Sequence, residues 1–387
     1  MKSLKITLSA IAISSVSTIA VAAADFNNQV FKQGIDQIFS GIPEKEAPGC
    51  SVGVIEKGVI IHRAGYGIAN LEHDIPLDDN TIFRMASISK QFTAMSVHLM
   101  AEDGIIDLDE DIRTYLPDLI DYGQKVTIRA MLGHYSGMGD YDLIAASYEG
   151  EKIEGGISLK SAAGGPFRLG NEDYVTIKEF YELVKKVKLK HVPGTTYEYS
   201  NLAYFLFSML VEERTGLTLR QYAQDRIFTP LQMKNTLFVD DGNEIIKMRA
   251  TGYAKTDDGR YQTDMTNLFM VGDGGLHTSI NDFIKWDQNF YTPKLGKDPT
   301  KLMNYFTTPP SDWKFEEPPY ANGQNVEEID GRKAFTHSGG WLGTSTFYMR
   351  FPDEQFSVVT LCNDVDQTPS EHSRAIAKLF FELRDKK

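Results

Sequence analysis

One pair of residues has the types and the spacing for nucleophilic chemistry. Lys90 follows Ser87 by three positions, and on a helix residues three apart share one face, with their Cβ atoms about 5–6 Å apart. A serine so placed can pass its proton to a neutral lysine and attack a carbonyl carbon. The pattern alone is weak evidence, because a capping serine followed by a surface lysine is common. Ser311 and Lys314 repeat the same spacing.

The residues around Lys90 argue against a lysine exposed to water. Lys90 is the only charged residue from Ser87 to Ala101, and apolar residues lie on two opposite sides of the predicted helix. This pattern is typical of a buried helix. Burial disfavours the ammonium form, so we expect Lys90 to have a lowered pKa and to be able to act as a base. Lys314, which has acidic neighbours, is expected to be exposed.

A tyrosine and an asparagine form a second constellation. Tyr199 and Asn201 stand at the start of the uncharged segment 201–211, which predicts another buried helix. A phenol close to a lysine ammonium loses its proton more easily, so Tyr199 could relay protons to a leaving group. Asn201 can donate to a substrate carbonyl and accept from Lys90. A second Tyr-x-Asn pattern, at 320–322, lies in a stretch rich in Pro and Gly and ranks lower.

The third constellation is a histidine at the end of a predicted strand that runs into two glycines. Its residues are His337, Ser338, Gly339 and Gly340. A strand beside an active-site serine can offer a backbone N–H group to an oxyanion, and glycine lets a substrate backbone approach. Taken alone, such a histidine is more often an ordinary hairpin residue.

The elements that must position these residues can be predicted from the periodicity of apolar residues. Strands near both ends of the chain, with helices between them, predict an α/β (α+β) fold. In this fold one antiparallel sheet is built from the N- and C-terminal strands and flanked by helices, and an all-α region is inserted. The Gly-rich residues 142–173 are expected to form a long surface loop. Helices are expected over 30–39, through much of 87–235 and over 376–383, and strands over 51–66 (a hairpin turning at 57–58), 334–337, 344–350 and 355–361.

Composition excludes several classes of protein. The chain has 387 residues, of which 42% are hydrophobic, and a formal net charge of −13, values typical of a soluble globular protein. The negative charge argues against nucleic acid and against an anionic membrane surface as partners. Two cysteines and eight histidines without an HExxH or HxH pattern predict no metal site. No cofactor is expected.

The first 24 residues have the layout of a secretory signal peptide. Lys2 and Lys5 precede the uncharged stretch 6–21, and three alanines precede Asp25. A membrane anchor is the alternative, but the stretch is short for a span of about 20 residues and contains several serines. We therefore expect an exported protein, periplasmic or secreted, that is not stably inserted in a membrane.

The three constellations, in this order, are much more specific than any one of them. The chain resembles the serine β-lactamase and penicillin-recognising enzyme family, on its class C side, in the segments FRMASISKQFTA, MLGHYSGMGDY, PGTTYEYSNLAY, GDGGLHTSINDFIKW and HSGGWLG. The resemblance spans roughly residues 30–385. It implies the β-lactamase/transpeptidase-like fold in a single catalytic domain, 25–387, whereas length alone suggests two or three domains. The α/β part would cover about 25–86 and 270–387, and the mainly helical part about 87–269.

The resemblance also implies roles for the site residues. Ser87 would be the nucleophile, and Lys90 and Tyr199 would exchange its proton; which of the two is the base stays open, because a close pair titrates together. The N–H groups of Ser87 and Gly340 would hold the oxyanion. The residues expected to contact the substrate or the oxyanion are Asn201, His337, Ser338, Gly339 and Gly340.

These features predict an exported serine hydrolase that forms an acyl-Ser87 intermediate on an ester or amide bond. The substrate would be a small ester or a short peptide containing a D-residue, with peptidoglycan fragments among the candidates. A class C-type β-lactamase or DD-carboxypeptidase is the alternative, and His337, where most of the family has lysine, argues against it. A non-catalytic recogniser of cell-wall peptides is the alternative from another class. The sequence does not indicate an oligomeric state.

The resemblance bears on the two cysteines as well. Cys50 stands at the start of the first predicted strand and Cys362 at the end of the last, and in the family these strands are antiparallel neighbours. An exported protein meets an oxidising compartment, so a disulfide is one alternative. Two buried thiols are the other, ranked slightly ahead. A Cα separation above about 7 Å would exclude the bond.

Overall fold

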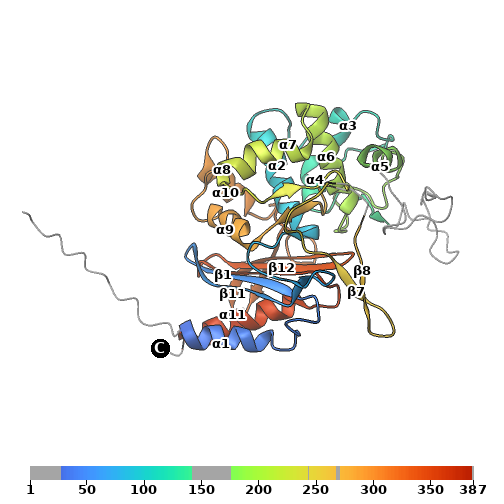
Figure 1. The fold of residues 1–387 in the computed structure, drawn as a ribbon. Coiled ribbons are helices and arrows are strands. Elements are labelled where there is room, and N and C mark those ends of the chain that lie inside the picture. Colours follow the sequence, from blue (N-terminus) through green and yellow to red (C-terminus); the bar gives the residue numbers. More distant parts are fainter. Residues whose placement is uncertain (1–27, 142–175, 243, 267–270, 386–387) are drawn as a thin grey trace, which may run out of the picture.

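The computed structural model describes residues 28–141, 176–242, 244–266 and 271–385 of the chain. The expected signal peptide (1–24) and the expected surface loop (142–173) lie outside these residues. In the described part, a mainly helical region lies above one face of a large sheet, and helices from the two chain ends lie below the other face (Figure 1). None of the helices described is long and apolar enough to cross a membrane.

The large sheet is built from both ends of the chain, as predicted. It has six antiparallel strands in the order β10-β11-β12-β13-β1-β2, so the N-terminal hairpin pairs with the last C-terminal strand. The hairpin turns at Lys57 and Gly58, which both have positive φ. The strands are β1 (Cys50–Glu56), β2 (Val59–Tyr66), β10 (Asn325–Ile329), β11 (Arg332–Trp341), β12 (Thr344–Phe351) and β13 (Phe356–Cys362).

A disulfide joins β1, the first strand of the N-terminal hairpin, to its neighbour β13, the last C-terminal strand. Cys50 of β1 lies directly opposite Cys362 of β13. Their Cα atoms are 4.0 Å apart and their sulfurs are bonded. The alternative ranked second from the sequence is therefore the one that the structure contains, because the register of the two strands brings the cysteines face to face.

Helices from the two chain ends cover one face of the sheet (Figure 1). They are α1 (Asn28–Ile38) and α11 (Pro369–Asp385). The apolar stripe of α1 contributes Phe31 and Ile35, and that of α11 contributes Ile376 and Phe380, to a core shared with the sheet. Phe380 stacks on Phe356 of β13 with ring centroids 4.0 Å apart. The amphipathic helices predicted at the two ends are thus both present.

The helical region is centred on α2 (Lys90–Glu102), the buried helix predicted from its two-sided apolar pattern. Its residues are buried from Lys90 to Met100. It packs against α6 (Asn201–Thr215), which is buried from Leu202 to Val211. Two helices of this region have side-chain caps, at Thr176 and at Thr218. The other helical elements are α3 (Ile112–Tyr115), α4 (Ile128–Leu132), α5 (Ile177–Val184), α7 (Leu219–Ala223), the π-turn η4 (Gln224–Phe228), α8 (Thr229–Leu231) and α10 (Pro299–Phe306).

Short strands complete the fold, and some lie within the range expected to be mainly helical. They form a three-stranded sheet in the order β5-β9-β6 and two small hairpins, β3-β4 and β7-β8. At two or three residues each, they are too short to show a period-two pattern in the sequence. Their bounds are β3 (Ile68–Asn70), β4 (Ile75–Pro76), β5 (Phe83–Arg84), β6 (Leu237–Phe238), β7 (Tyr253–Lys255), β8 (Tyr261–Thr263) and β9 (Leu276–Thr278).

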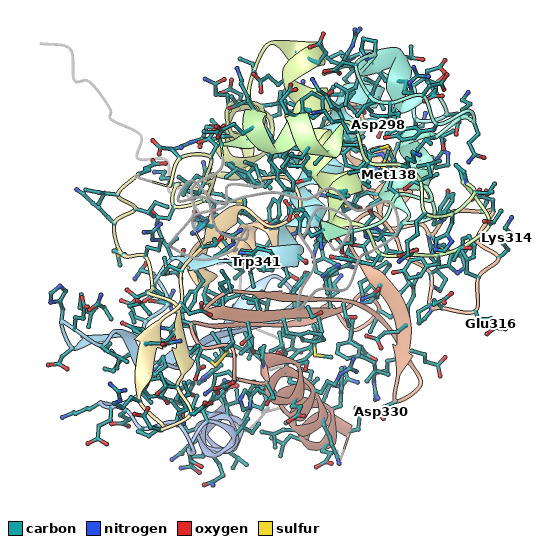
Figure 2. The ribbon with its side chains drawn as sticks, turned by 90° about the vertical axis from the view of Figure 1, so that its right-hand side faces the viewer. Met138, Asp298, Lys314, Glu316, Asp330 and Trp341 are labelled. Carbon is teal, nitrogen blue, oxygen red and sulfur yellow. A yellow bond between two sulfur atoms is a disulfide. The ribbon has the colours of Figure 1, made fainter. Side chains whose placement is uncertain are left out.

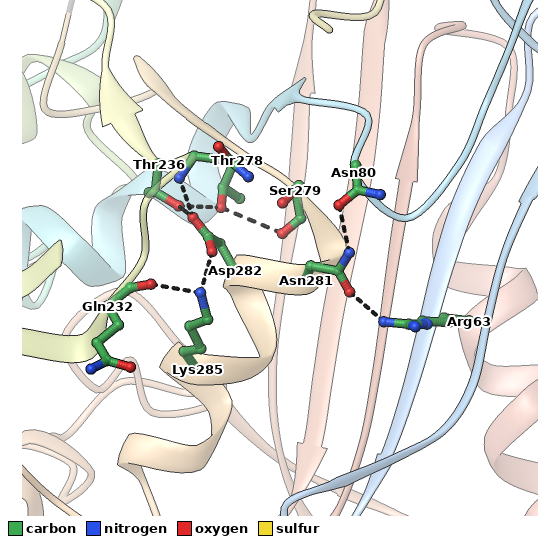
Figure 3. Close-up of polar contacts among 10 residues, drawn as sticks. Arg63, Asn80, Gln232, Thr236, Thr278, Ser279, Asn281, Asp282 and Lys285 are labelled. Carbon is green, nitrogen blue, oxygen red and sulfur yellow. Dashed lines mark hydrogen bonds and ion pairs between the residues drawn. The ribbon is translucent and has the colours of Figure 1, made fainter. Parts of the chain in front are cut away.

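The first turn of α9 (Ile280–Asn289) joins the helical region to the sheet (Figure 3). The buried carboxylate of Asp282 accepts the backbone N–H of Asn235 at 2.5 Å and the hydroxyl of Thr236 at 3.1 Å. One position earlier, Asn281 accepts from the guanidinium of Arg63 in β2 at 2.7 Å. Two adjacent side chains of one helix therefore fix both layers relative to each other.

Candidate active site

Ser87 lies in the 3-10 turn η1 (Ala86–Ser89), between the short strand β5 and the buried helix α2. Ala86 has a φ of 44°, a conformation that is uncommon for a residue with a side chain and recurs at functional sites. Just before it, the N–H of Met85 donates to Leu276 of β9 at 2.8 Å. The small sheet therefore holds the backbone that leads into Ser87, and Ser87 itself is partly exposed.

The ammonium of Lys90 has three hydrogen-bond acceptors and no contact with water. The Lys90 side chain is 0% exposed. Its Nζ atom donates to Ser87 Oγ at 3.2 Å, to Asn201 Oδ1 at 2.6 Å and to the Asp273 carbonyl at 2.8 Å. Burial lowers the pKa of Lys90 to about 8, against the opposing effect of the carboxylates of Asp273 and Asp140. A neutral amine beside Ser87 is therefore accessible in mildly alkaline water, as expected from the sequence.

Tyr199 stands next to this pair. The Lys90 Nζ atom lies 4.8 Å from the centroid of its ring. Burial raises the pKa of Tyr199 well above its usual value, and the neighbouring Ser87 side chain only partly opposes the rise. The sequence-based expectation that Tyr199 loses its proton more easily is therefore wrong, because burial, with the carboxylates of Asp140 and Asp273, raises its pKa. Tyr199 is held as a neutral phenol, and no described residue hydrogen-bonds to its hydroxyl with ordinary geometry.

Asn201 is held between a cation and an anion. Its Oδ1 atom accepts from Lys90, as the sequence suggested, and its Nδ2 atom donates to Asp140 Oδ2 at 2.9 Å. Asp140 also accepts the backbone N–H of Tyr141 at 2.8 Å. Burial raises the pKa of Asp140, and Tyr141, Lys90 and Asn201 oppose this rise. The orientation of the Asn201 amide is thus fixed before any substrate arrives.

Sequence reasoning missed three residues that support the site: Asp140, which is half-buried, and Asp273 and His134, which are buried. The Asp273 carboxylate accepts from the hydroxyl of Tyr141. His134 Nδ1 accepts the N–H of Ser200 at 3.1 Å, and its ring lies 4.2 Å from that of Tyr199. All three lie in segments that carry the family resemblance, which was the available signal, but nothing in their spacing indicated a role. Among the described residues, no group of three or more His, Cys, Asp or Glu is placed to hold a metal ion.

Both ring nitrogens of His337 are already occupied. Nδ1 lies 2.6 Å from the carbonyl oxygen of Ser338, and Nε2 lies 2.8 Å from the hydroxyl of Tyr320. A carbonyl can only accept, so we assign the proton to Nδ1 and let the Tyr320 hydroxyl donate to Nε2. Burial, with a smaller contribution from Lys90, lowers the pKa of His337 to about 3. His337 is therefore neutral in neutral water, and neither nitrogen offers a free N–H to a substrate.

The strand that carries His337 presents an unpaired edge in its second half. Strand β10 pairs with β11 only as far as Thr336, whereas β12 pairs with β11 as far as Trp341. Residues 337–341 therefore have one edge without a strand partner in the described part of the chain. Ser338 lies opposite Phe347, which packs in the core under α11. Because directly opposite residues share a face, the Ser338 side chain lies on that far face, and only its backbone remains for a substrate.

The two glycines of β11 differ in the space around them. A Cβ atom on Gly339 would overlap the carbonyl oxygen of Met85 and the hydroxyl of Thr346, whereas a Cβ atom on Gly340 would have no atom within 4 Å. Gly339 therefore permits the close approach of β11 to η1. The Cβ direction of Gly340 is on the far face of the sheet, like that of Ser338, and no atom there restricts a side chain.

The two rival patterns in the sequence have different outcomes. Ser311 and Lys314 are both exposed, and Lys314 lies at the edge of the molecule in Figure 2. Tyr320, from the lower-ranked Tyr-x-Asn pattern, is fully buried and contacts His337 through its hydroxyl. It is therefore part of the surroundings of the site, a role that its Pro- and Gly-rich sequence context did not indicate.

Comparison with known proteins finds one matching family and several relatives of this chain. Residues 29–381 match the family model described as Beta-lactamase. The D-aminopeptidase of Gluconobacter oxydans (strain 621H) is 26% identical to this chain, over 90% of this chain and 62% of its own length. The chain thus spans about three fifths of that curated relative.

Two solved structures show the same fold. The octameric penicillin-binding protein homologue from Pyrococcus abyssi has a TM-score of 0.75 and 22% identity, over 92% of this chain and 78% of its own. The D-amino acid amidase from Ochrobactrum anthropi SV3 has a TM-score of 0.71 and 20% identity, over 92% of this chain and 99% of its own. The fold predicted from the sequence is thereby confirmed.

The contrast between the two glycines can be tested by stability. We expect Gly339→Ala to lower the free energy of unfolding by about 1–3 kcal/mol, because the added methyl group displaces β11 from the turn that carries Ser87. Gly340→Ala is the matched control and should change it by less than about 0.5 kcal/mol. Urea denaturation of the two variants measures the difference. Equal effects would show that β11 does not need glycine to approach η1.

Proposed function

Because this chain belongs to the beta-lactamase family, we propose that it is a serine hydrolase that forms an acyl-Ser87 intermediate on an ester or amide bond. The observation that carries the proposal is the fully buried Lys90 amine, 3.2 Å from Ser87 Oγ and with a lowered pKa. Relatives named as a D-aminopeptidase and a D-amino acid amidase support chemistry at an amide bond. The presence of both Ser87 and Lys90 argues against a protein that recognises cell-wall peptides without catalysis.

Acylation begins with proton transfer from Ser87 to Lys90. The Ser87 oxygen attacks the carbonyl carbon while the neutral amine takes the hydroxyl proton. Tyr199 then gives its phenolic proton to the leaving group and regains one from the Lys90 ammonium. The opposite pKa directions support this division, since burial lowers the pKa of Lys90 and raises that of Tyr199. We therefore assign the base to Lys90 and the relay to Tyr199, which the sequence left open.

The tetrahedral oxyanion would be held by the N–H groups of Ser87 and Gly340. Each such donor contributes about 3–4 kcal/mol to transition-state stabilisation in enzymes of this kind. The unpaired edge of β11 at residues 337–341 supports this placement. A water molecule then attacks the acyl-Ser87 ester, and the Lys90–Tyr199 pair accepts its proton. The bond to Ser87 Oγ breaks, and the pair passes a proton to this oxygen, which restores the free enzyme.

We propose that the preferred substrates are small esters or amides of D-residues, without a carboxylate on the leaving group. The support is His337, which is neutral and has both nitrogens engaged. A lysine at this position would give a carboxylate a charge-assisted hydrogen bond, worth about 1.5–3 kcal/mol. A β-lactamase or DD-carboxypeptidase remains the alternative, because the remaining groups of the site serve those reactions equally well.

Labelling with a serine-directed fluorophosphonate tests the nucleophile and the base together. We expect peptide mapping to find the label on Ser87 and not on Ser311. The labelling rate should rise up to tenfold per pH unit below pH 8 and level off above it, because the neutral Lys90 amine becomes populated as the pH passes its pKa of about 8. Removal of a general base slows such reactions by about 10²–10⁴-fold, so Lys90→Met should label slowly and without this rise. Label on Ser311, or a rate independent of Lys90, would contradict the mechanism.

A comparison of substrates tests the role of His337. At pH 8 we expect kcat/KM for a p-nitrophenyl ester or a D-residue p-nitroanilide to exceed that for a chromogenic cephalosporin by at least about tenfold, the equivalent of one missing charge-assisted bond. His337→Lys should shift the ratio toward the cephalosporin, and the neutral variant His337→Gln should not. Efficient cephalosporin turnover by the unmodified protein would overturn this assignment.

Export is also a proposal. The signal-peptide layout of residues 1–24 and the disulfide between Cys50 and Cys362 support it, because disulfides persist in oxidising compartments. Expression of the full chain in a bacterial host should yield protein in the extracytoplasmic fraction whose N-terminal residue, determined by mass spectrometry, is Asp25. Full-length protein confined to the cytoplasm would count against export.

A further inference from the structure

A small cavity lies beyond the end of β11, and the proposed chemistry does not use it. It offers about 40 Å³ and is lined by residues of β5, β9, the segment around 249–252 and the turn between β11 and β12. Since an ordered water needs about 10–15 Å³, the cavity has room for one group the size of a carboxylate. Its charged side chains are Arg84, three residues before Ser87, and Arg249.

Both guanidinium groups line this cavity. Neither forms an ion pair with a carboxylate in the described part of the chain. The carboxylates of Asp273 and Glu244 raise the pKa of Arg84 and of Arg249, respectively, but from beyond ion-pair distance. Glu244 is itself ion-paired with Arg220. Arg84 uses its Nε atom to donate to the Gly274 carbonyl at 3.1 Å. Two partly buried cations without an ion-pair partner are unfavourable, and an anion between them would relieve the repulsion.

The other polar groups at the cavity are already engaged. His277 donates from Nδ1 to the carbonyl of Gly275 at 3.1 Å, and burial keeps it neutral. The amide of Asn363 donates to backbone carbonyls, including that of Ile68 at 3.0 Å. The nearby carboxylate of Asp264 accepts the N–H of Gly343 at 2.8 Å. The free terminal nitrogens of the two arginines are therefore the donors that an incoming anion would meet.

The direction of the substrate along β11 places this cavity on the acyl side of the scissile bond. The Tyr199 ring lies 6.1 Å from that of His337, so a leaving group protonated by Tyr199 departs at the His337 end of the strand. The acyl group then extends the other way, toward Trp341, which lies near the middle of the view in Figure 2. From Gly340 to Gly343, which lines the cavity, three residues span at most about 11 Å.

We propose that Arg84 and Arg249 form an anion subsite that binds a carboxylate at the far end of the substrate's acyl group. The proposal rests on the proposed function, because it takes its direction from the acyl-Ser87 intermediate. Planar guanidinium groups suit a carboxylate, which they can bind through paired hydrogen bonds. The preferred substrates are then esters or amides of dicarboxylic acids, or peptides with an acidic residue on the acyl side. Recognition of negative charge is thereby moved from the leaving group, where His337 is neutral, to the acyl group.

Matched ester pairs test the subsite in the active enzyme. Adipic, pimelic and suberic acid are each tested as two p-nitrophenyl esters, one with the second carboxylate free and one with it methylated. Spontaneous hydrolysis is subtracted. We expect the ratio of kcat/KM, charged to neutral, to reach about tenfold or more for at least one chain length. Arg249→Gln should lower this ratio about tenfold, and Arg249→Lys should retain part of it. Arg260→Gln, which removes an exposed arginine next to β8, is the control and should leave the ratio unchanged.

Calorimetry separates a failure of this proposal from a failure of the proposed function. Suberate is titrated into Ser87→Ala and into Ser87→Ala with Arg249→Gln, with suberic acid monoamide as the matched ligand. We expect the dianion to bind Ser87→Ala at least about tenfold more tightly than it binds the double variant. Binding without any ester turnover in the unmodified protein would overturn the function and leave the subsite intact. Equal ratios for the unmodified protein and Arg249→Gln, or equal suberate affinities of the two Ser87→Ala proteins, would overturn the subsite.

Discussion

The removal of one ammonium group from water governs the arrangement of this site. Lys90 opens a helix whose first eleven residues are all buried, so its charge must be met by protein groups. The side chain of Asn201, the carbonyl of Asp273 and the hydroxyl of Ser87 meet it directly. Each of these acceptors comes from a different segment of the chain. The need to compensate one buried cation therefore draws α6, the segment before β9 and the nucleophile turn to a single point.

These groups do not fully compensate the buried charge of Lys90, and the resulting fall in its pKa lets the amine act as a base. Burial lowers the pKa of Lys90 to about 8 despite its three acceptors and the nearby carboxylates. Full pairing would have kept the lysine permanently charged and unable to accept a proton. The carboxylate of Asp140 reaches the ammonium only through the amide of Asn201. The interposed amide thus fixes the orientation of the site, and the Asp140 charge, which acts on Lys90 without a direct hydrogen bond, opposes the effect of burial only in part.

The part of this arrangement that the sequence predicted is the part set by local patterns. Apolar residues on both sides of 87–101 predicted the buried helix, and the burial of Lys90 followed from it. The strands at both ends predicted the sheet. Asp140 and Asp273 were not predicted, because their approach to Lys90 depends on loop paths that leave no periodic trace. The pKa of Tyr199 was predicted with the wrong sign, because its complete burial, which the sequence does not show, raises the pKa.

The disulfide has a mechanical consequence for the molecule. It connects the first residue of β1 to the last residue of β13, across 312 positions of the chain, so everything between them forms one covalent ring. A pulling force applied at the two termini would pass from one cysteine to the other through the sulfur bridge. Such a force would unravel α1 and α11, which lie outside the ring, and leave the ring itself without load. The whole candidate site, from Ser87 to Gly340, lies inside the unloaded part.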